Sequence, residues 1–74
     1  MRPKKATDIY KEIGEQIKAR REEKGLSQAG LGEIMGVHRN NIGEAELGKR
    51  GMSLDTLAKY CKALDLEIKL EKKD

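Results

Sequence analysis

The sequence has almost none of the residues that cross-link a small protein. Its 74 residues include one cysteine, Cys61, and one histidine, His38. Because a disulfide needs a second cysteine and a structural zinc site needs about four Cys or His ligands, neither can form within the chain. Domains shorter than roughly 70–80 residues usually need a disulfide, a metal or a partner subunit for adequate stability. The composition therefore predicts an oligomer that holds no metal and no cofactor.

Aromatic residues and long apolar runs are also scarce. The chain has no tryptophan or phenylalanine and only two tyrosines, too few for single-stranded bases to stack on. No apolar run exceeds three residues, so we expect no membrane span, and the N-terminus lacks the apolar core of a secretory signal. A lone thiol also fits a reducing compartment. We therefore expect a cytoplasmic protein without a membrane partner.

Residue patterns that support catalysis are missing. Ser27 has no neighbouring base and no G-x-S-x-G setting, and His38 has no carboxylate cluster beside it. The glycines do not form the phosphate-binding pattern G-x-x-x-x-G-K-S/T. Cys61 lies on an apolar stripe, so we expect it to be a small core residue. The sequence predicts a protein that is not an enzyme and takes no small-molecule substrate.

Charged residues, by contrast, are abundant and mildly basic in sum. Lysine and arginine number 16 and aspartate and glutamate 13, for a formal net charge of +3. Such an excess suggests nucleic acid, but it also fits an ordinary solvated surface. The basic residues gather at positions 2–5, 18–21, 39 and 49–50. The arrangement of these clusters in the fold must decide between the two interpretations.

Glycines and serines divide the chain into helices. Gly25, Gly36 and Gly48 each follow an apolar helical pattern and are typical of left-handed C-caps. Ser27 and Ser53 suit N-caps, with one apolar residue before each cap and another four positions after it. These signals predict helices over about 7–24, 27–35, 38–47 and 53–64. The second and third helices are joined so tightly that they must cross at a steep angle.

The two longer helices carry apolar stripes with helical spacing. The stripes consist of Ile9, Ile13 and Ile17 in the first helix and Leu54, Leu57, Ala58, Cys61 and Leu64 in the fourth. Gly32 falls where the two short helices approach most closely, a place that admits only a very small side chain. The sequence predicts an all-α domain over residues 7–64, preceded by a flexible basic N-terminus at residues 1–6.

After Leu64 the apolar period changes to two. Residues 64–70 alternate apolar and charged, which is typical of a strand with one buried face. A lone strand leaves its backbone groups unpaired, so we expect residues 65–74 to form a dimerisation tail whose strand pairs with its own copy. Centring the pairing on Ile68 sets Glu67 opposite Lys69. The expected dimer contacts are Leu66, Glu67, Ile68, Lys69 and Leu70. The alternative is a tail that continues the fourth helix or frays.

The stretch SQAGLGEIMGVHRNNI, residues 27–42, resembles the helix-turn-helix of the Xre family, which includes lambdoid phage repressors and Cro. The similarity runs from Ile13 through GKRGMSLDTL to about Leu64. It implies a lambda-repressor-like domain of four to five helices that binds double-stranded DNA as a homodimer and represses transcription at an inverted repeat. The tail LDLEIKL also resembles HipB-like antitoxins, and HRNNIG resembles the recognition helix of restriction-modification controller proteins. An antitoxin would chiefly neutralise a toxin protein and use DNA binding for autoregulation.

The third predicted helix would read the DNA. With Ile42 inward, a step of about 100° per residue turns Asn40, Gly43 and Glu44 outward. In the major groove, arginine bonds guanine, asparagine bonds adenine, and glutamate accepts from the cytosine amino group. The expected base contacts are His38, Arg39, Asn40, Gly43 and Glu44.

The resemblance also implies phosphate contacts and one ion pair. In the family, the residue corresponding to Gln28 begins a helix against the DNA backbone, where free N–H groups attract an anion. The expected phosphate contacts are Ser27, Gln28, Asn41, Lys49 and Arg50. Arg21 and Glu46 match a structural salt bridge of the phage repressors.

Some residues depart from the pattern of a DNA-reading surface. Gly30 and Gly43 weaken their helices. The Glu44 carboxylate repels DNA phosphates unless it accepts a hydrogen bond from a cytosine amino group. Leu47 is apolar and is expected to point outward. These departures keep open the alternative that the main partner is a protein.

Overall fold

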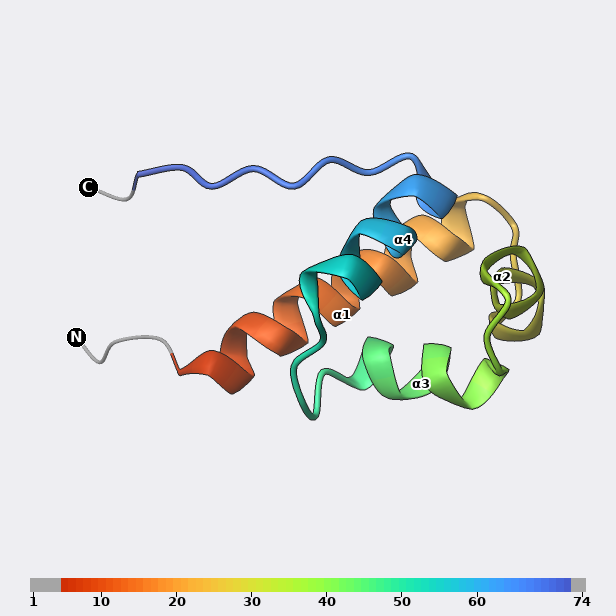
Figure 1. The fold of residues 1–74 in the computed structure, drawn as a ribbon, viewed down its shortest axis with the longest axis horizontal. Coiled ribbons are helices and arrows are strands. Elements are labelled where there is room, and N and C mark those ends of the chain that lie inside the picture. The colour runs from red at the N-terminus through yellow and green to blue at the C-terminus, as the bar shows by residue number, and fades with distance from the viewer. Residues whose placement is uncertain (1–4, 73–74) are drawn as a thin grey trace.

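The computed structural model describes residues 5–72, and this part of the chain contains four helices (Figure 1). The helices are α1 (Ala6–Glu23), α2 (Gln28–Met35), α3 (Arg39–Leu47) and α4 (Leu54–Leu64). The predicted all-α fold and its division into helices are confirmed. Lys5 caps α1 and Ala6 is its first residue, so the helix begins inside the segment expected to be flexible. The rest of that segment, residues 1–4, lies outside the described residues.

The serines and two of the three glycines expected to cap the helices do so, whereas the C-cap of α1 is Lys24 and Gly25 follows it with φ of 70°. Ser27 and Ser53 each accept a hydrogen bond from the backbone N–H three positions on, at 2.9 and 3.1 Å. His38 caps α3 through its Nδ1, which accepts from the N–H two positions on at 3.1 Å. Gly36 and Gly48 end α2 and α3 with φ of 72° and 63°, a region that glycine enters without strain. Local chemistry therefore sets where the two short helices begin and end.

The hydrophobic core is small and draws on all four helices. Its fully buried members, each at most 2% exposed, are Ile17, Leu31, Ile42, Tyr60 and Leu64. Burying a side chain of this size contributes roughly 1.5–3 kcal/mol before the loss of chain entropy is counted. Both α1 and α2 contact α3, and both also contact α4. The core therefore fixes α3 from two directions.

The apolar stripe predicted for α4 is partly wrong. Leu54 is 78% exposed and Ala58 is exposed, whereas Tyr60, outside the predicted stripe, is 2% exposed. The ring of Tyr60 carries more apolar surface than either residue and takes the inner position. This rotation of α4 leaves Cys61 half-buried at the edge of the core, where we expected a core residue.

Two helix crossings depend on glycine. A Cβ on Gly14 would lie 2.5 Å from the carbonyl oxygen of Glu46, so α1 and α3 meet there through their backbones. A Cβ on Gly32 would lie 2.6 Å from the carbonyl oxygen of Val37. The expected close approach at Gly32 is confirmed, and the sequence analysis overlooked the equally close approach at Gly14.

The segment after α4 forms no strand in the described part of the chain. Asp65 turns it with φ of 55° and ψ of 49°, which rules out the alternative that α4 continues. Lys24 Nζ holds the Asp65 carboxylate at 2.7 Å, and this hydrogen bond lowers the pKa of Asp65. Residues 66–72 then run extended beside α1 and α4 (Figure 1). A ladder requires a second strand, so the pairing stays a prediction, and residues 73–74 lie outside the described residues.

We predict that Gly14→Ala lowers the free energy of unfolding by about 1–3 kcal/mol, because the added Cβ overlaps the α3 backbone. Gly43→Ala is the matched control, since its Cβ would meet Gln28 Oε1 at 3.5 Å, an ordinary contact. Alanine in that helix interior should raise stability by about 0.5–1 kcal/mol. Urea denaturation followed by circular dichroism measures both variants. Equal stabilisation by the two substitutions would contradict the close approach of α1 and α3.

Candidate nucleic-acid interface

One face of α3 is exposed from its first turn to its last. Ile42 is fully buried beneath the helix. Arg39, Asn40 and Glu44 are exposed on the outer side, with Gly43 half-buried beside them. The expected orientation of the helix is therefore confirmed, and the structure brings these four residues together.

A shallow depression follows one side of this face. It is lined by Lys18, Gln28, Arg39, Asn40, Gly43, Glu44, Glu46 and Leu47. Lys18 is a cation of α1 that the sequence analysis gave no role. Its signal is the basic cluster at 18–21, in which the resemblance assigned only Arg21, to the salt bridge with Glu46. The crossing of α1 and α3 buries Arg21 and leaves Lys18 at the surface.

A buried ion pair fastens α3 to α1. Arg21 Nε and Nη2 donate to the two carboxylate oxygens of Glu46 at 2.6 and 3.1 Å. The side chains are 9% and 4% exposed, and Arg21 Nη1 also donates to the carbonyl oxygen of Leu26 at 2.7 Å. The hydrogen bond with Glu46 raises the pKa of Arg21, against the opposing effect of burial. The ion pair that the resemblance implied is present in the structure.

Gln28 adds α2 to the same network. Its Nε2 donates to Glu46 Oε1 at 3.1 Å, and its side-chain amide lies over Gly43. The first turn of α2 is thereby tied to the inner side of α3. This amide group is engaged with Glu46 in the free protein, and the phosphate contact expected of Gln28 stays a prediction.

The structure pairs two residues that the sequence analysis assigned to different targets. Arg50 Nη2 donates to Glu44 Oε2 at 2.8 Å, and the two side chains are 79% and 52% exposed. Glu44 was expected to read a base and Arg50 to contact a phosphate. The loop after α3 therefore reaches back onto the exposed face and covers the Glu44 carboxylate with a cation.

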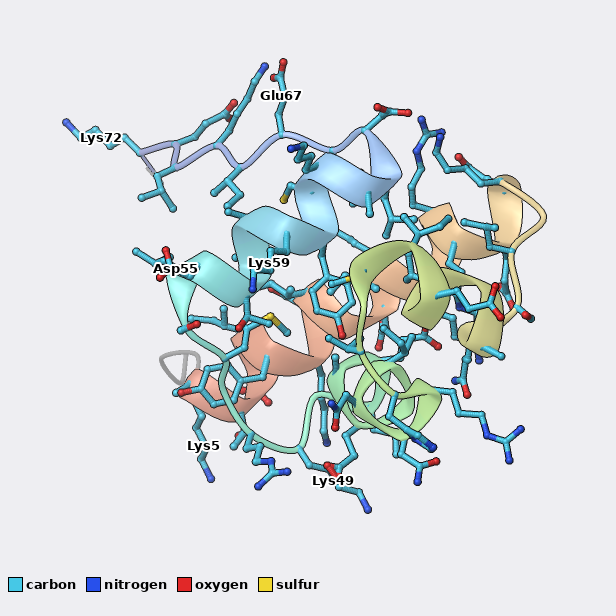
Figure 2. The ribbon with its side chains drawn as sticks, turned by 45° about the vertical axis from the view of Figure 1, so that its right-hand side comes forward. Lys5, Lys49, Asp55, Lys59, Glu67 and Lys72 are labelled. Atoms are coloured by element: carbon cyan, nitrogen blue, oxygen red, sulfur yellow. The ribbon has the colours of Figure 1, made fainter. Side chains whose placement is uncertain are left out.

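The other expected contacts lie around the same face. Ser27 and His38 stand at the starts of α2 and α3 as N-caps. Asn41 lies on the opposite flank of α3, in a second depression that it lines together with Arg50. Lys49 projects outward on the side of the molecule where α3 lies (Figure 2). Each expected DNA-contacting residue thus lies on or beside α3 or at the start of α2.

Two other features are absent from the described residues. Among residues 5–72, no three His, Cys, Asp or Glu side chains gather in a way that suits a metal ion. No helix in that range has both the length and the apolar character needed to cross a bilayer. The exposed face of α3 is the feature around which charged and amide side chains collect.

Comparison with known proteins matches this arrangement to a family. The helix-turn-helix family matches residues 17–70, a range that contains the whole of α2 and α3. The chain belongs to the helix-turn-helix family. In such proteins the second helix of the motif enters the major groove of DNA, so the expectation of a sequence-specific DNA-binding transcriptional regulator is confirmed. The resemblance to the Xre family is confirmed with it.

Two relatives carry names that refer to control. "Control protein C.SmaI" of Serratia marcescens is 38% identical to this helix-turn-helix protein over 61 residues, which cover 82% of this chain and 73% of the relative. The crystal structure of the restriction-modification controller protein C.AhdI from Aeromonas hydrophila superposes with a TM-score of 0.78 at 33% identity, covering 86% of this chain and 93% of that one. A chain in a HipA-HipB-O2-O3 complex has a TM-score of 0.76 over the full length of both chains. Its 19% identity shows a shared fold alone.

We predict that Arg21→Met lowers the free energy of unfolding by about 3–5 kcal/mol, because Glu46 would remain buried without a counter-ion. Adding Glu46→Leu should recover much of that loss, since two apolar side chains can fill the same space. Urea denaturation at neutral pH measures both variants. Lys24→Met, which breaks the exposed pair with Asp65, is the matched control and should have a much smaller effect. A similar loss for Arg21→Met and Lys24→Met would contradict the importance of the buried pair.

Proposed function

We propose that this protein acts as a homodimer that represses transcription by binding an inverted-repeat operator with α3 in the major groove. The observation that carries this proposal is the outward face of α3, held in place by the buried pair between Arg21 and Glu46. A recognition surface discriminates best when its supporting residues are locked by packing and hydrogen bonds. The identities of 38% and 33% to two control proteins favour a role as a controller of a restriction-modification system.

The proposed base contacts follow from the chemistry of the exposed side chains. Arg39 would donate two hydrogen bonds to a guanine, and Asn40 would bond an adenine in the same way. Glu44 would accept from the amino group of a cytosine. Gly43 would let the helix backbone approach the bases, and His38 would contact a thymine methyl or the adjacent backbone.

The proposed phosphate contacts surround these base-contacting residues. Lys49 and Lys18 supply charge on two sides of α3, and the N-terminus of α2 offers backbone N–H groups beside Ser27 and Gln28. Asn41 would bond a phosphate from the other flank. Each neutralised phosphate adds to the salt dependence of binding. These contacts fix the position of the protein on DNA and carry no sequence preference of their own.

The proposed dimer uses an apolar groove between α1, α4 and the C-terminal segment. The groove is lined by Ile9, Ile13, Gln16, Ile17, Leu57, Tyr60, Cys61, Leu66, Glu67, Ile68, Lys69 and Leu70. Ile68 and Leu70 are 50% and 97% exposed in the single chain, so a second copy could cover them. Pairing of the segment about Ile68 would set Glu67 against the partner's Lys69, in place of the 3.8 Å contact that these two residues make within one chain.

The position of the C-terminal segment suits two-site DNA binding. Glu67 and Lys49 point to opposite sides of the molecule, and α3 lies on the Lys49 side (Figures 1 and 2). A two-fold axis running from the tails toward α3 leaves both copies of α3 on one common side. Helix-turn-helix dimers place their two recognition helices about 34 Å apart, one turn of DNA.

Protein binding is the second candidate function. Ile34 and Leu47 are each 58% exposed outside the groove. Single apolar residues are ordinary on a protein surface, so they support a protein partner only together with the exposed apolar residues of the C-terminal segment. If the protein neutralises a toxin through these side chains, its DNA binding would serve autoregulation. Under this alternative, Arg39→Ala would abolish operator selection and leave binding of the toxin intact.

We predict that Arg39→Ala weakens binding to the preferred operator by about 5- to 150-fold and relaxes the preference at one base pair. Lys49→Ala should instead weaken binding to all sequences alike and reduce the salt slope by about one. The operator comes from selection of random duplexes with the wild-type protein, and fluorescence anisotropy at several salt concentrations gives the affinities. An unchanged affinity and sequence preference after Arg39→Ala would contradict the assignment of Arg39 as a base-contacting residue.

We predict that the double variant Ile68→Lys, Leu70→Lys is monomeric at concentrations where the wild type is a dimer, because burying two lysines at the interface is costly. Leu54→Lys is the matched control, since Leu54 is 78% exposed and lies outside the groove. Sedimentation equilibrium measures the dissociation constants. Equal constants for the double variant and the control would remove the C-terminal segment from the interface.

A further inference from the structure

We propose that Arg50 is a positioning residue for Glu44: it holds the carboxylate toward one base pair of the operator and so contributes to sequence selectivity. This inference rests on the proposed function, in which α3 reads the major groove. It replaces the earlier expectation that Arg50 contacts a phosphate independently. The cation would act through Glu44 and would not itself touch the base.

The geometry of the pair leaves one carboxylate oxygen of Glu44 able to accept a hydrogen bond from a base. Arg50 Nη2 donates to Oε2 of Glu44 at 2.8 Å. Among residues 5–72 no hydrogen bond engages Oε1, so this oxygen can accept from a base. Glu44 lines both depressions beside α3, whereas Arg50 lines the one on the Asn41 flank. The cation therefore approaches from one side and leaves the side of Arg39 and Asn40 open.

The loop that carries Arg50 is fixed at both ends against α1. A Cβ on Gly48 would lie 2.5 Å from the Cα of Lys11, and a Cβ on Gly51 would lie 2.9 Å from the Tyr10 ring. Two glycines in close contact with one helix thus bracket residues 49–50. The backbone on either side of Arg50 is therefore constrained, and the bond to Glu44 sets the direction of its exposed side chain.

Electrostatics favour a cationic partner for a carboxylate on this face. An isolated carboxylate that approaches DNA is repelled by the phosphates unless a cytosine amino group pairs with it. A guanidinium at 2.8 Å neutralises this charge locally while the carboxylate keeps an acceptor oxygen. Because both side chains are more than half exposed, the pair contributes little to folding. Its effect should appear in DNA discrimination and not in stability.

The test measures affinity for the selected operator and for versions with each base pair replaced in turn. The proteins are wild type, Glu44→Gln, Arg50→Ala, Arg50→Lys, the double variant Glu44→Gln, Arg50→Ala, and Lys49→Ala as the matched loop control. We expect wild type to prefer a C·G pair at one position by about 5- to 150-fold and Glu44→Gln to lose that preference. Arg50→Ala should lose most of the same preference while the preference read by Arg39 persists.

Two further results distinguish positioning of Glu44 by Arg50 from a general effect of the positive charge of Arg50. Arg50→Lys should restore part of the preference, because lysine keeps the charge without the planar fork. The double variant should discriminate no less than Glu44→Gln alone, and Lys49→Ala should weaken all operators by one common factor. Urea denaturation should give the same stability for Arg50→Ala and wild type.

A different pattern overturns the inference without touching the proposed function. If Arg50→Ala weakens every operator by a common factor, as Lys49→Ala does, Arg50 is a phosphate contact and does not position Glu44. If no variant, Arg39→Ala included, changes any base preference, the proposed function fails together with the inference.

Discussion

One buried carboxylate determines which side of α3 faces the core. Glu46 receives hydrogen bonds from Arg21 of α1 and Gln28 of α2, so three helices meet at a single side chain. A buried ion pair of this kind is often no more stabilising than well-packed apolar residues. Its value here is directional, because the bidentate bond fixes which side of α3 faces inward. A turn of the helix by one residue would carry Arg39 and Asn40 away from the exposed face on which they lie.

Backbone contact between α1 and α3 makes that bond possible. At Gly14 the two helices approach so closely that a methyl group would overlap the carbonyl oxygens of Ala45 and Glu46. Two turns further along α1, Arg21 is then near enough to bond Glu46 with both nitrogens of its fork. Glycine in a helix interior costs roughly 0.5–1 kcal/mol relative to alanine. The fold accepts this loss because a larger residue would separate the helices that the ion pair joins.

Features fixed by local chemistry could be predicted from residue type. Among the features fixed by helix crossings, the close approach at Gly32 was predicted, and the Arg21–Glu46 pair was implied by the resemblance, but others were not. Ser27, Gly36 and Gly48 act within one turn of the chain, so the ends of α2 and α3 were predictable from residue type alone. Tyr60 and Lys18 owe their places to the way whole helices pack. Helical spacing predicted an apolar stripe for α4 that includes Leu54, but the larger ring of Tyr60 takes the inner position and Leu54 lies at the surface. The pairing of Glu44 with Arg50 depends on the path of a loop held against α1, which no spacing rule describes.

The small core and the exposed groove have a joint consequence for regulation. Among residues 5–72, five apolar side chains are at most 2% exposed, which gives a domain of this length little reserve of stability. Apolar residues of the C-terminal segment meanwhile remain in water. In the proposed dimer, covering these residues adds to the stability of both protomers, so folding and association are linked through protein concentration. In this proposal operator binding requires the dimer, and when monomers predominate, the dimer concentration rises with the square of the monomer concentration. Occupancy of the operator would then respond more steeply to the amount of protein than binding by a monomer could. Under the proposed dimerisation, the apolar surface left for a second copy would give binding a concentration threshold.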